Sequence, residues 1–253
     1  MLRKGLWVGL LGVLALAGWW IVLPAAVSGL KDRVASESGL SVILDAPTGF
    51  GFDPRIDGTA PKPWQVLIAL GGLREAAAVY PEGVLDTYAP RVLLAGRLEI
   101  LSHRVGGTLQ PGWVLLATDY LGPGNGSGAL ARVYHHEVSS LLIASRPFPD
   151  ALWRAALPDA FSYPEGDAAR LAATRVHADD LEPFHADGFV SDYGVSSMEN
   201  DINTYAELLL SDPGRLAALA IEYPAIARKA RLVRDYYEAL HPDFAARLAE
   251  NGG

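Results

Sequence analysis

Residues 129–145 read ALARVYHHEVSSLLIAS and form the stretch that decides the fold. On a helical wheel, apolar residues fill one side of this helix, and Glu137 falls among them. A carboxylate on a core-facing side needs a partner, a metal ion or a proton. His136 and Ser140 lie one turn apart at the margin of the apolar side, and His135 lies at the opposite margin and faces elsewhere. We expect this helix to carry the chemistry of the protein.

The run from His136 to Ser140 is a variant of H-E-x-x-H. In that motif two histidines bind zinc from one helix face, and the glutamate acts as general base on a zinc-bound water. Here Ser140 replaces the second histidine. The motif alone also fits a second interpretation, in which Glu137 is a structural carboxylate paired with an arginine or with His136.

A second helix is predicted after residue 196, because Ser196 and Glu199 have the spacing of a capping box. Beside its apolar side lie Asn200, Asn203 and Glu207. An acid flanked by two amides at the edge of a core is typical of a metal or substrate site, although a satisfied surface triplet has the same pattern.

The two helices together resemble the zincin metallopeptidases, in the gluzincin branch, whose third zinc ligand is a glutamate. Gly188-Phe189-Val190-Ser191-x-Tyr193, followed by Tyr205-Ala206-Glu207, is similar to the third-ligand region of bacterial zinc-binding metallopeptidases and of lethal-factor-like domains. The similarity extends over residues 62–210, and its specific part is the two motifs.

By this resemblance His136 is the first zinc ligand and Glu207 the third. Glu137 is the general base, and Tyr193 is a loop tyrosine near the substrate. Ser140 stands at the second ligand position, where a neutral hydroxyl competes weakly with water. We therefore predict weak or absent zinc binding, unless another residue completes the site. The candidates are His135, His177 and His185, of which His185 is favoured because it is close in sequence to the Tyr193 loop.

The N-terminus has the features of a membrane anchor. Residues 5–23 carry no charge, follow Arg3 and Lys4, and are nearly long enough to span a bilayer as a helix. We predict a signal anchor over residues 1–28 with the following domain on the extracytoplasmic side, periplasmic or extracellular. Small residues at 26–28 would permit cleavage, and the protein would then be secreted.

Residues 29–253 are expected to form one zincin-like domain of the α+β class, with a lobe at 29–146 and a mainly helical lobe at 147–253. A short strand is expected at 41–45. Strands at 91–101 and 113–119 are predicted to pair as a hairpin with a long loop. Helices are predicted at 63–80, 198–210, 212–240 and 242–250. The basic residues of 225–237, Lys229 among them, are predicted to form a solvated face.

The sequence predicts a membrane-anchored zincin-like protein, which is either a zinc-dependent peptidase (a hydrolase of peptide or protein substrates) or a catalytically impaired relative. The alternative is a non-enzymatic, membrane-tethered binding or structural module. The net charge of -8 disfavours nucleic-acid binding, and the absence of cysteine excludes thiolate metal sites. Gly124-x-Gly126-x-x-Ala129 lacks the repeated βαβ context of a nucleotide-binding loop.

Overall fold

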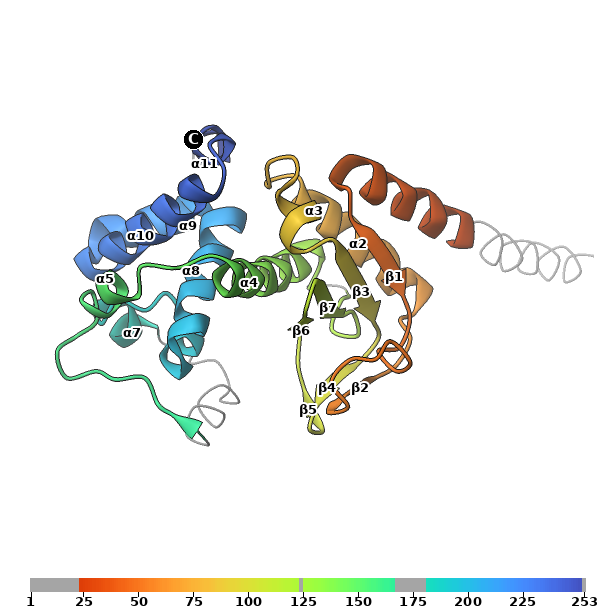
Figure 1. Cartoon of the computed structure of the whole chain (residues 1–253), viewed down its shortest axis with the longest axis horizontal. Coiled ribbons are helices and arrows are strands. Elements are labelled where there is room, and N and C mark those ends of the chain that lie inside the picture. The colour runs from red at the N-terminus through yellow and green to blue at the C-terminus, as the bar shows by residue number, and fades with distance from the viewer. Residues whose placement is uncertain (1–22, 123–124, 167–180, 252–253) are drawn as a thin grey trace, which may run out of the picture.

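The computed structural model describes residues 23–122, 125–166 and 181–251 (Figure 1). Residues 1–22 of the predicted anchor and His177 lie outside these ranges. The described chain begins with a helix over residues 23–38. No helix within the described ranges combines the length and the apolar character needed to cross a membrane.

The larger sheet has four strands, in the order β1-β3-β7-β6. They are β1 (Ser41–Leu44), β3 (Arg91–Ala95), β7 (Trp113–Ala117) and β6 (Gly107–Gln110). The first three are parallel, and β6 is antiparallel to β7 at the edge. The predicted hairpin between residues 91–101 and 113–119 is therefore wrong. The hairpin partner of β7 is β6, which lies within the predicted loop.

The parallel pairing of β3 and β7 follows from their burial. Both strands are almost continuously apolar, which is typical of strands covered on both faces. Val92 and Leu94 belong to the main core, with helices α2 (Pro63–Ala77) and α4 (Ser127–Ser145), whereas Leu93 and Ala95 belong to a second core. This second core includes residues of the small antiparallel sheet of β2 (Ile56–Gly58), β4 (Leu98–Ile100) and β5 (His103–Arg104).

The C-terminal half is helical, so the α+β class is confirmed. In Figure 1, α4 lies between the sheet and a set of later helices. These are α8 (Met198–Ser211), α9 (Pro213–Glu222), α10 (Pro224–Leu240) and α11 (Asp243–Asn251). The single helix predicted over 212–240 is two helices, because Pro224 has no N–H to continue α9 and instead begins α10. Shorter elements are α3 (Val84–Tyr88), α5 (Asp150–Arg154), α7 (Glu182–Ala186) and the 3₁₀ turn η1 (Asp192–Ser196).

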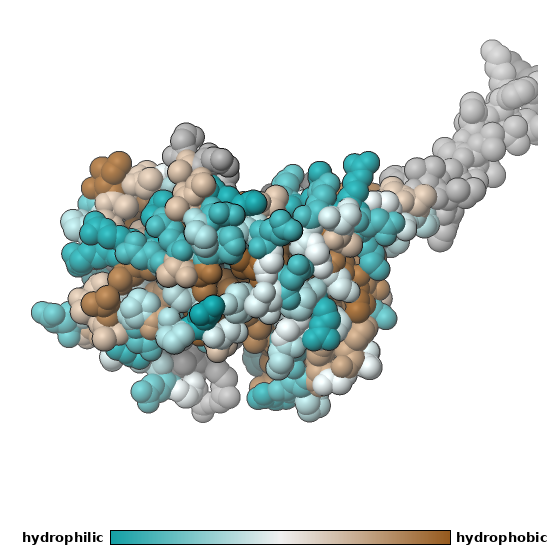
Figure 2. All heavy atoms as spheres, turned by 45° about the horizontal axis from the view of Figure 1, so that its top comes forward, coloured by the Kyte–Doolittle hydropathy of each residue, from teal (hydrophilic) through white to brown (hydrophobic). Residues whose placement is uncertain are grey.

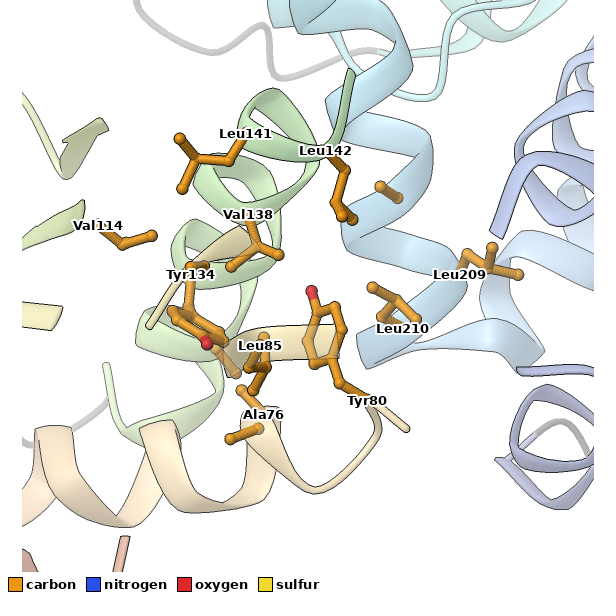
Figure 3. Close-up of a cluster of buried hydrophobic side chains, with 14 of the residues drawn as sticks. Ala76, Tyr80, Leu85, Val114, Tyr134, Val138, Leu141, Leu142, Leu209 and Leu210 are labelled. Atoms are coloured by element: carbon orange, nitrogen blue, oxygen red, sulfur yellow. The ribbon is translucent and has the colours of Figure 1, made fainter. Parts of the chain in front are cut away.

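The main core is continuous from the sheet through α4 to α8 (Figure 3). Tyr134 and Val138 of α4 meet Tyr80 on one side, and Leu142 points towards α8. Tyr80 shares a hydrogen bond of 3.0 Å with Nδ1 of His135, and burial lowers the pKa of that histidine to about 3. His135 is therefore a neutral core residue. On the face shown in Figure 2, hydrophobic residues gather in the hollow between the sheet half and the helical half.

Candidate functional site

The packing of α4 against α8 brings two of the predicted site residues into direct contact. Nδ1 of His136 lies 2.6 Å from Oε1 of Glu207, although 71 positions separate them in the chain. The two side chains are 12% and 22% exposed, so the pair sits at the edge of the core within reach of solvent. The positions that the resemblance gives to the first and third zinc ligands are thus adjacent.

The Glu207 carboxylate sets the charge of the imidazole. Burial alone lowers the pKa of His136, but the hydrogen bond and the charge of Glu207 outweigh burial and raise that pKa above its ordinary value. The charge of Glu137 and a side-chain interaction in which Asn200 acts as acceptor work in the same direction. The pair is therefore a charge-assisted hydrogen bond at mildly acid pH.

Glu137 lies on the side of α4 that faces the edge strand β6. A Cβ atom placed on Gly107 would come within 3.0 Å of Cγ and Oε1 of Glu137, so the glycine makes room for this carboxylate. Burial raises the pKa of Glu137 to about 7, which the charge of His136 opposes. A carboxyl group with this pKa can take or give a proton near neutral pH.

Tyr193, which belongs to η1, lies beside His136. Its ring centroid is 5.6 Å from that of His136. Burial raises the pKa of Tyr193 to about 12, with further contributions from Glu137 and Glu207, so the phenol stays neutral. The side chain of Asn200 lies close enough to Tyr193 and His136 to influence the pKa of both.

The loop before α8 is fixed by a cap that differs from the predicted one. The N-cap residue is Ser197, whose Oγ accepts a hydrogen bond of 3.0 Å from the backbone N–H of Asn200. Ser196 instead donates to the carbonyl of Tyr193 and accepts from the Asn200 amide at 2.8 Å. The predicted capping box of Ser196 and Glu199 is therefore wrong by one position, and Asn200 becomes the residue that ties the loop to the site.

Ser140, at the second ligand position, is hydrogen-bonded to Asn203. Its Oγ accepts a hydrogen bond of 2.7 Å from Nδ2 of Asn203, and both side chains are buried. Asn203 and Glu207 are one turn apart on α8, as Ser140 and His136 are on α4. The two helices are thus joined by two successive polar contacts.

The proposed substitute ligand His185 lies at a different place. It belongs to the short helix α7, and its ring packs against that of Tyr223 with 5.5 Å between centroids, where α9 meets α10. His135 bonds Tyr80 in the core. His135 and His185 thus contact Tyr80 and Tyr223, and neither of these contacts involves Glu207.

The donor set can be tested against zinc. A catalytic zinc ion normally has three protein ligands and one open position. Of the three ligand positions that the resemblance assigns, two hold one imidazole and one carboxylate, and the third holds a hydroxyl already bonded to an amide. No group of three or more His, Asp or Glu side chains in the described ranges is placed to hold a metal ion. Within the described ranges, these donors by themselves therefore do not fit a catalytic zinc site.

A buried charge pair between α10 and α8 differs from the sequence prediction. Lys229 was predicted to be solvated with its basic neighbours, but it is fully buried and lies 2.6 Å from Oδ2 of Asp201. The signal was present on the wheel of α10, where Lys229 is three residues after Ile226 and four before Val233, both in the core.

Comparisons with known proteins give one distant likeness. No family model matches the chain, and no curated protein matches it. Among solved structures, it is similar to a protein from Bacteroides caccae ATCC 43185 described as a "putative zinc-binding metallo-peptidase". The identity is 16%, the match covers 89% of this chain and 92% of that chain, and the TM-score is 0.49. A likeness of this size carries no conclusion about the chemistry of the site.

Proposed function

We propose that this protein is a zincin-like domain whose metal centre has been replaced, and that it is a catalytically impaired relative of metal-dependent peptidases. The supporting observation is the 2.6 Å hydrogen bond between His136 and Glu207. Two residues that the motif resemblance assigns as zinc ligands are held together from different helices, while Ser140, in the place of the missing ligand, bonds Asn203. These two contacts support the proposal that hydrogen bonds have replaced a metal centre.

Peptide binding is the activity that this arrangement still supports. Strand β6 is the edge of the larger sheet, and Glu137 lies directly against it. An edge strand offers unpaired backbone groups to which an extended peptide can add as a further strand. We propose that a peptide or protein segment binds along β6, with its backbone next to Glu137 and Tyr193.

We further propose that residues 5–23 tether the domain to a membrane on its extracytoplasmic side. The support is the length of this uncharged segment and its position after Arg3 and Lys4.

The experiment that tests the replaced centre is a zinc titration of matched variants. Wild type should bind zinc weakly or not at all. Ser140→His combined with Asn203→Ser supplies the imidazole, removes the competing amide and makes room for the larger ring. This double variant should gain about tenfold or more in zinc affinity, because position 140 is one turn from His136.

Two controls make the result specific. Asn203→Ser alone should bind no better than wild type, and adding Glu207→Gln to the double variant should abolish the gain. Tight, stoichiometric zinc in the wild type would overturn the proposal and show that another residue completes an active site. Equal, negligible binding by all forms would mean that no latent zincin site exists, and would favour the structural module.

A further inference from the structure

The buried pair of Lys229 and Asp201 has an unusual environment. Nζ and Oδ2 are 2.6 Å apart, and both side chains are 0% exposed. The Nζ atom lies over three aromatic rings, at 4.1 to 5.8 Å from their centroids; they belong to Phe189, Trp153 and Tyr205. The amine and the carboxyl group therefore face each other, from α10 and α8, in a place closed to bulk water.

The two carboxylate oxygens of Asp201 differ in their hydrogen-bond partners. Oδ2 accepts hydrogen bonds from Lys229, from the Tyr163 hydroxyl at 2.6 Å and from Nε1 of Trp153 at 3.2 Å. Oδ1 is buried and has no hydrogen-bond partner among the described residues. A Cβ atom placed on Gly194 would lie 3.0 Å from Oδ1, so the loop backbone closes over it. A buried carboxylate oxygen without a donor is costly and calls for an explanation.

We propose that Lys229 and Asp201 become joined by an isopeptide bond, formed by the folded protein itself. The Nζ lone pair attacks Cγ of the protonated carboxyl group, and the Nζ–Cγ bond forms. The Cγ–Oδ1 bond then breaks. Oδ1 leaves as water with two protons that come from Nζ, one passed to the carboxylate before the attack and one lost from Nζ after it, so the reaction is a condensation that needs no oxidant or cofactor.

The product satisfies every polar group that the pair leaves in the core. The amide keeps one N–H, and the carbonyl oxygen of Gly188 lies 2.8 Å from Nζ to accept it. The amide oxygen is Oδ2, which retains its bonds from Tyr163 and Trp153. The atom that departs is Oδ1, the one without a partner. The bond also removes two opposite charges from an apolar interior.

The surroundings favour the reaction in three ways. Burial raises the pKa of Asp201 to about 6 and lowers the pKa of Lys229, although each charge opposes the shift of the other, so the neutral acid and amine become accessible. Because the fold holds the two groups in contact, the reaction is intramolecular, and its rate corresponds to a large effective concentration of amine at the carboxyl group. The donors on Oδ2 are placed to stabilise the negative charge that develops there during attack. The aromatic faces act in the opposite direction, because they stabilise the ammonium form of Lys229, which cannot attack. Proton transfer from Lys229 to Asp201 must therefore come first.

The bond would tie α10 covalently to α8, the helix that carries Glu207. The chain has no cysteine, so no disulfide can provide such a tie. This inference does not rest on the proposed function, because the pair lies behind the candidate site and touches neither His136 nor Glu137 in the contacts described above.

Mass spectrometry of the purified full chain tests the proposal. The wild type should be lighter than its sequence by one water molecule, once its N-terminus has been determined. Lys229→Arg keeps the cation and Asp201→Ala removes the acceptor, and both variants should have their full sequence masses. After tryptic digestion of the wild type, Lys229 should remain uncleaved and its peptide should be joined to the peptide that contains Asp201.

The wild type alone decides the matter if a variant fails to fold. A wild-type chain of full mass, with a linear peptide ending at a cleaved Lys229, would overturn the proposal and leave a buried ion pair.

Discussion

Nδ2 of Asn203 donates a hydrogen bond of 2.7 Å to Oγ of Ser140, joining α8 to α4 at the position where the motif lacks its second histidine. The oxygen of the same amide, Oδ1, is buried without a partner among the described residues. Ser140 therefore has a structural role in this protein, and its removal affects stability before it affects any chemistry.

Replacing Ser140 by alanine should lower the free energy of unfolding by about 1–3 kcal/mol, because the Asn203 amide loses its acceptor in a buried place. Urea denaturation at fixed pH measures this. Ser211→Ala is the matched control: this serine is on α8 and exposed, and its change should stay within about 0.5 kcal/mol. Similar effects of the two substitutions would contradict the structural role of Ser140.

The contact between His136 and Glu207 should appear as a coupling energy in a double-mutant cycle. With His136→Gln and Glu207→Gln, we expect about 1.5–3 kcal/mol of coupling near pH 6, as for a hydrogen bond between charged groups. Because the folded pKa of His136 is raised, its contribution is complete below the unfolded pKa and is lost as the pH rises through the folded pKa.

The control for this cycle is His241 with Asp243, an ion pair whose nitrogen and oxygen are 3.9 Å apart at the surface. It should show a coupling of less than about 1 kcal/mol. A coupling between His136 and Glu207 that is no larger than this, or that grows above neutral pH, would speak against the pair as described.

The sequence predicted the elements of the site better than the sheet. The helix periods of 129–145 and 198–210 correctly indicated which faces of α4 and α8 are apolar, so the adjacency of His136 and Glu207 could be anticipated from the motif resemblance. The strand pairing of the sheet could not be anticipated in this way. β3 and β7 are short apolar runs, and their direction is set by α4 and the second core rather than by local pattern.

Side-chain partners were the least predictable part. Lys229 sits among three arginines within seven positions, and local charge pattern suggests solvent, whereas its burial depends on Asp201 and three aromatic residues from other elements. The role of Asn203 was likewise hidden, because a wheel shows which face an amide occupies but not that Ser140 stands opposite it.

Gly107→Ala should disturb the site from the side of β6. The added Cβ would lie 2.6 Å from Cγ1 of Val133 and 3.0 Å from the Glu137 carboxylate, so α4 or its side chains must shift. We expect a loss of about 1–3 kcal/mol in stability and a changed pKa for Glu137. Gly106→Ala is the matched control, because its Cβ would meet Val133 at an ordinary 3.4 Å. Equal stabilities of the two variants would show that Gly107 does not constrain α4.

The membrane tether predicts where the protein is found in the cell. Wild type should sediment with membranes and resist extraction by high salt, whereas a chain starting at residue 29 should be soluble when made without the segment. Cell fractionation and N-terminal sequencing measure this. A wild-type chain that is released into the medium and begins near Gly29 would replace the anchor with a cleaved signal.

The protonation of Glu137 should make stability fall as the pH rises towards neutral. Its folded pKa of about 7 lies above the ordinary 4.5, so its contribution is complete below about pH 4.5 and is lost progressively as the pH rises to about 7. The shift corresponds to roughly 3 kcal/mol at most. Glu137→Gln imitates the protonated acid and should be more stable than the wild type above pH 7, with little difference at pH 4. Unfolding measured by urea across this range tests the sign, and a wild type that gains on the glutamine variant as the pH rises would show that folding lowers the pKa of Glu137 instead of raising it.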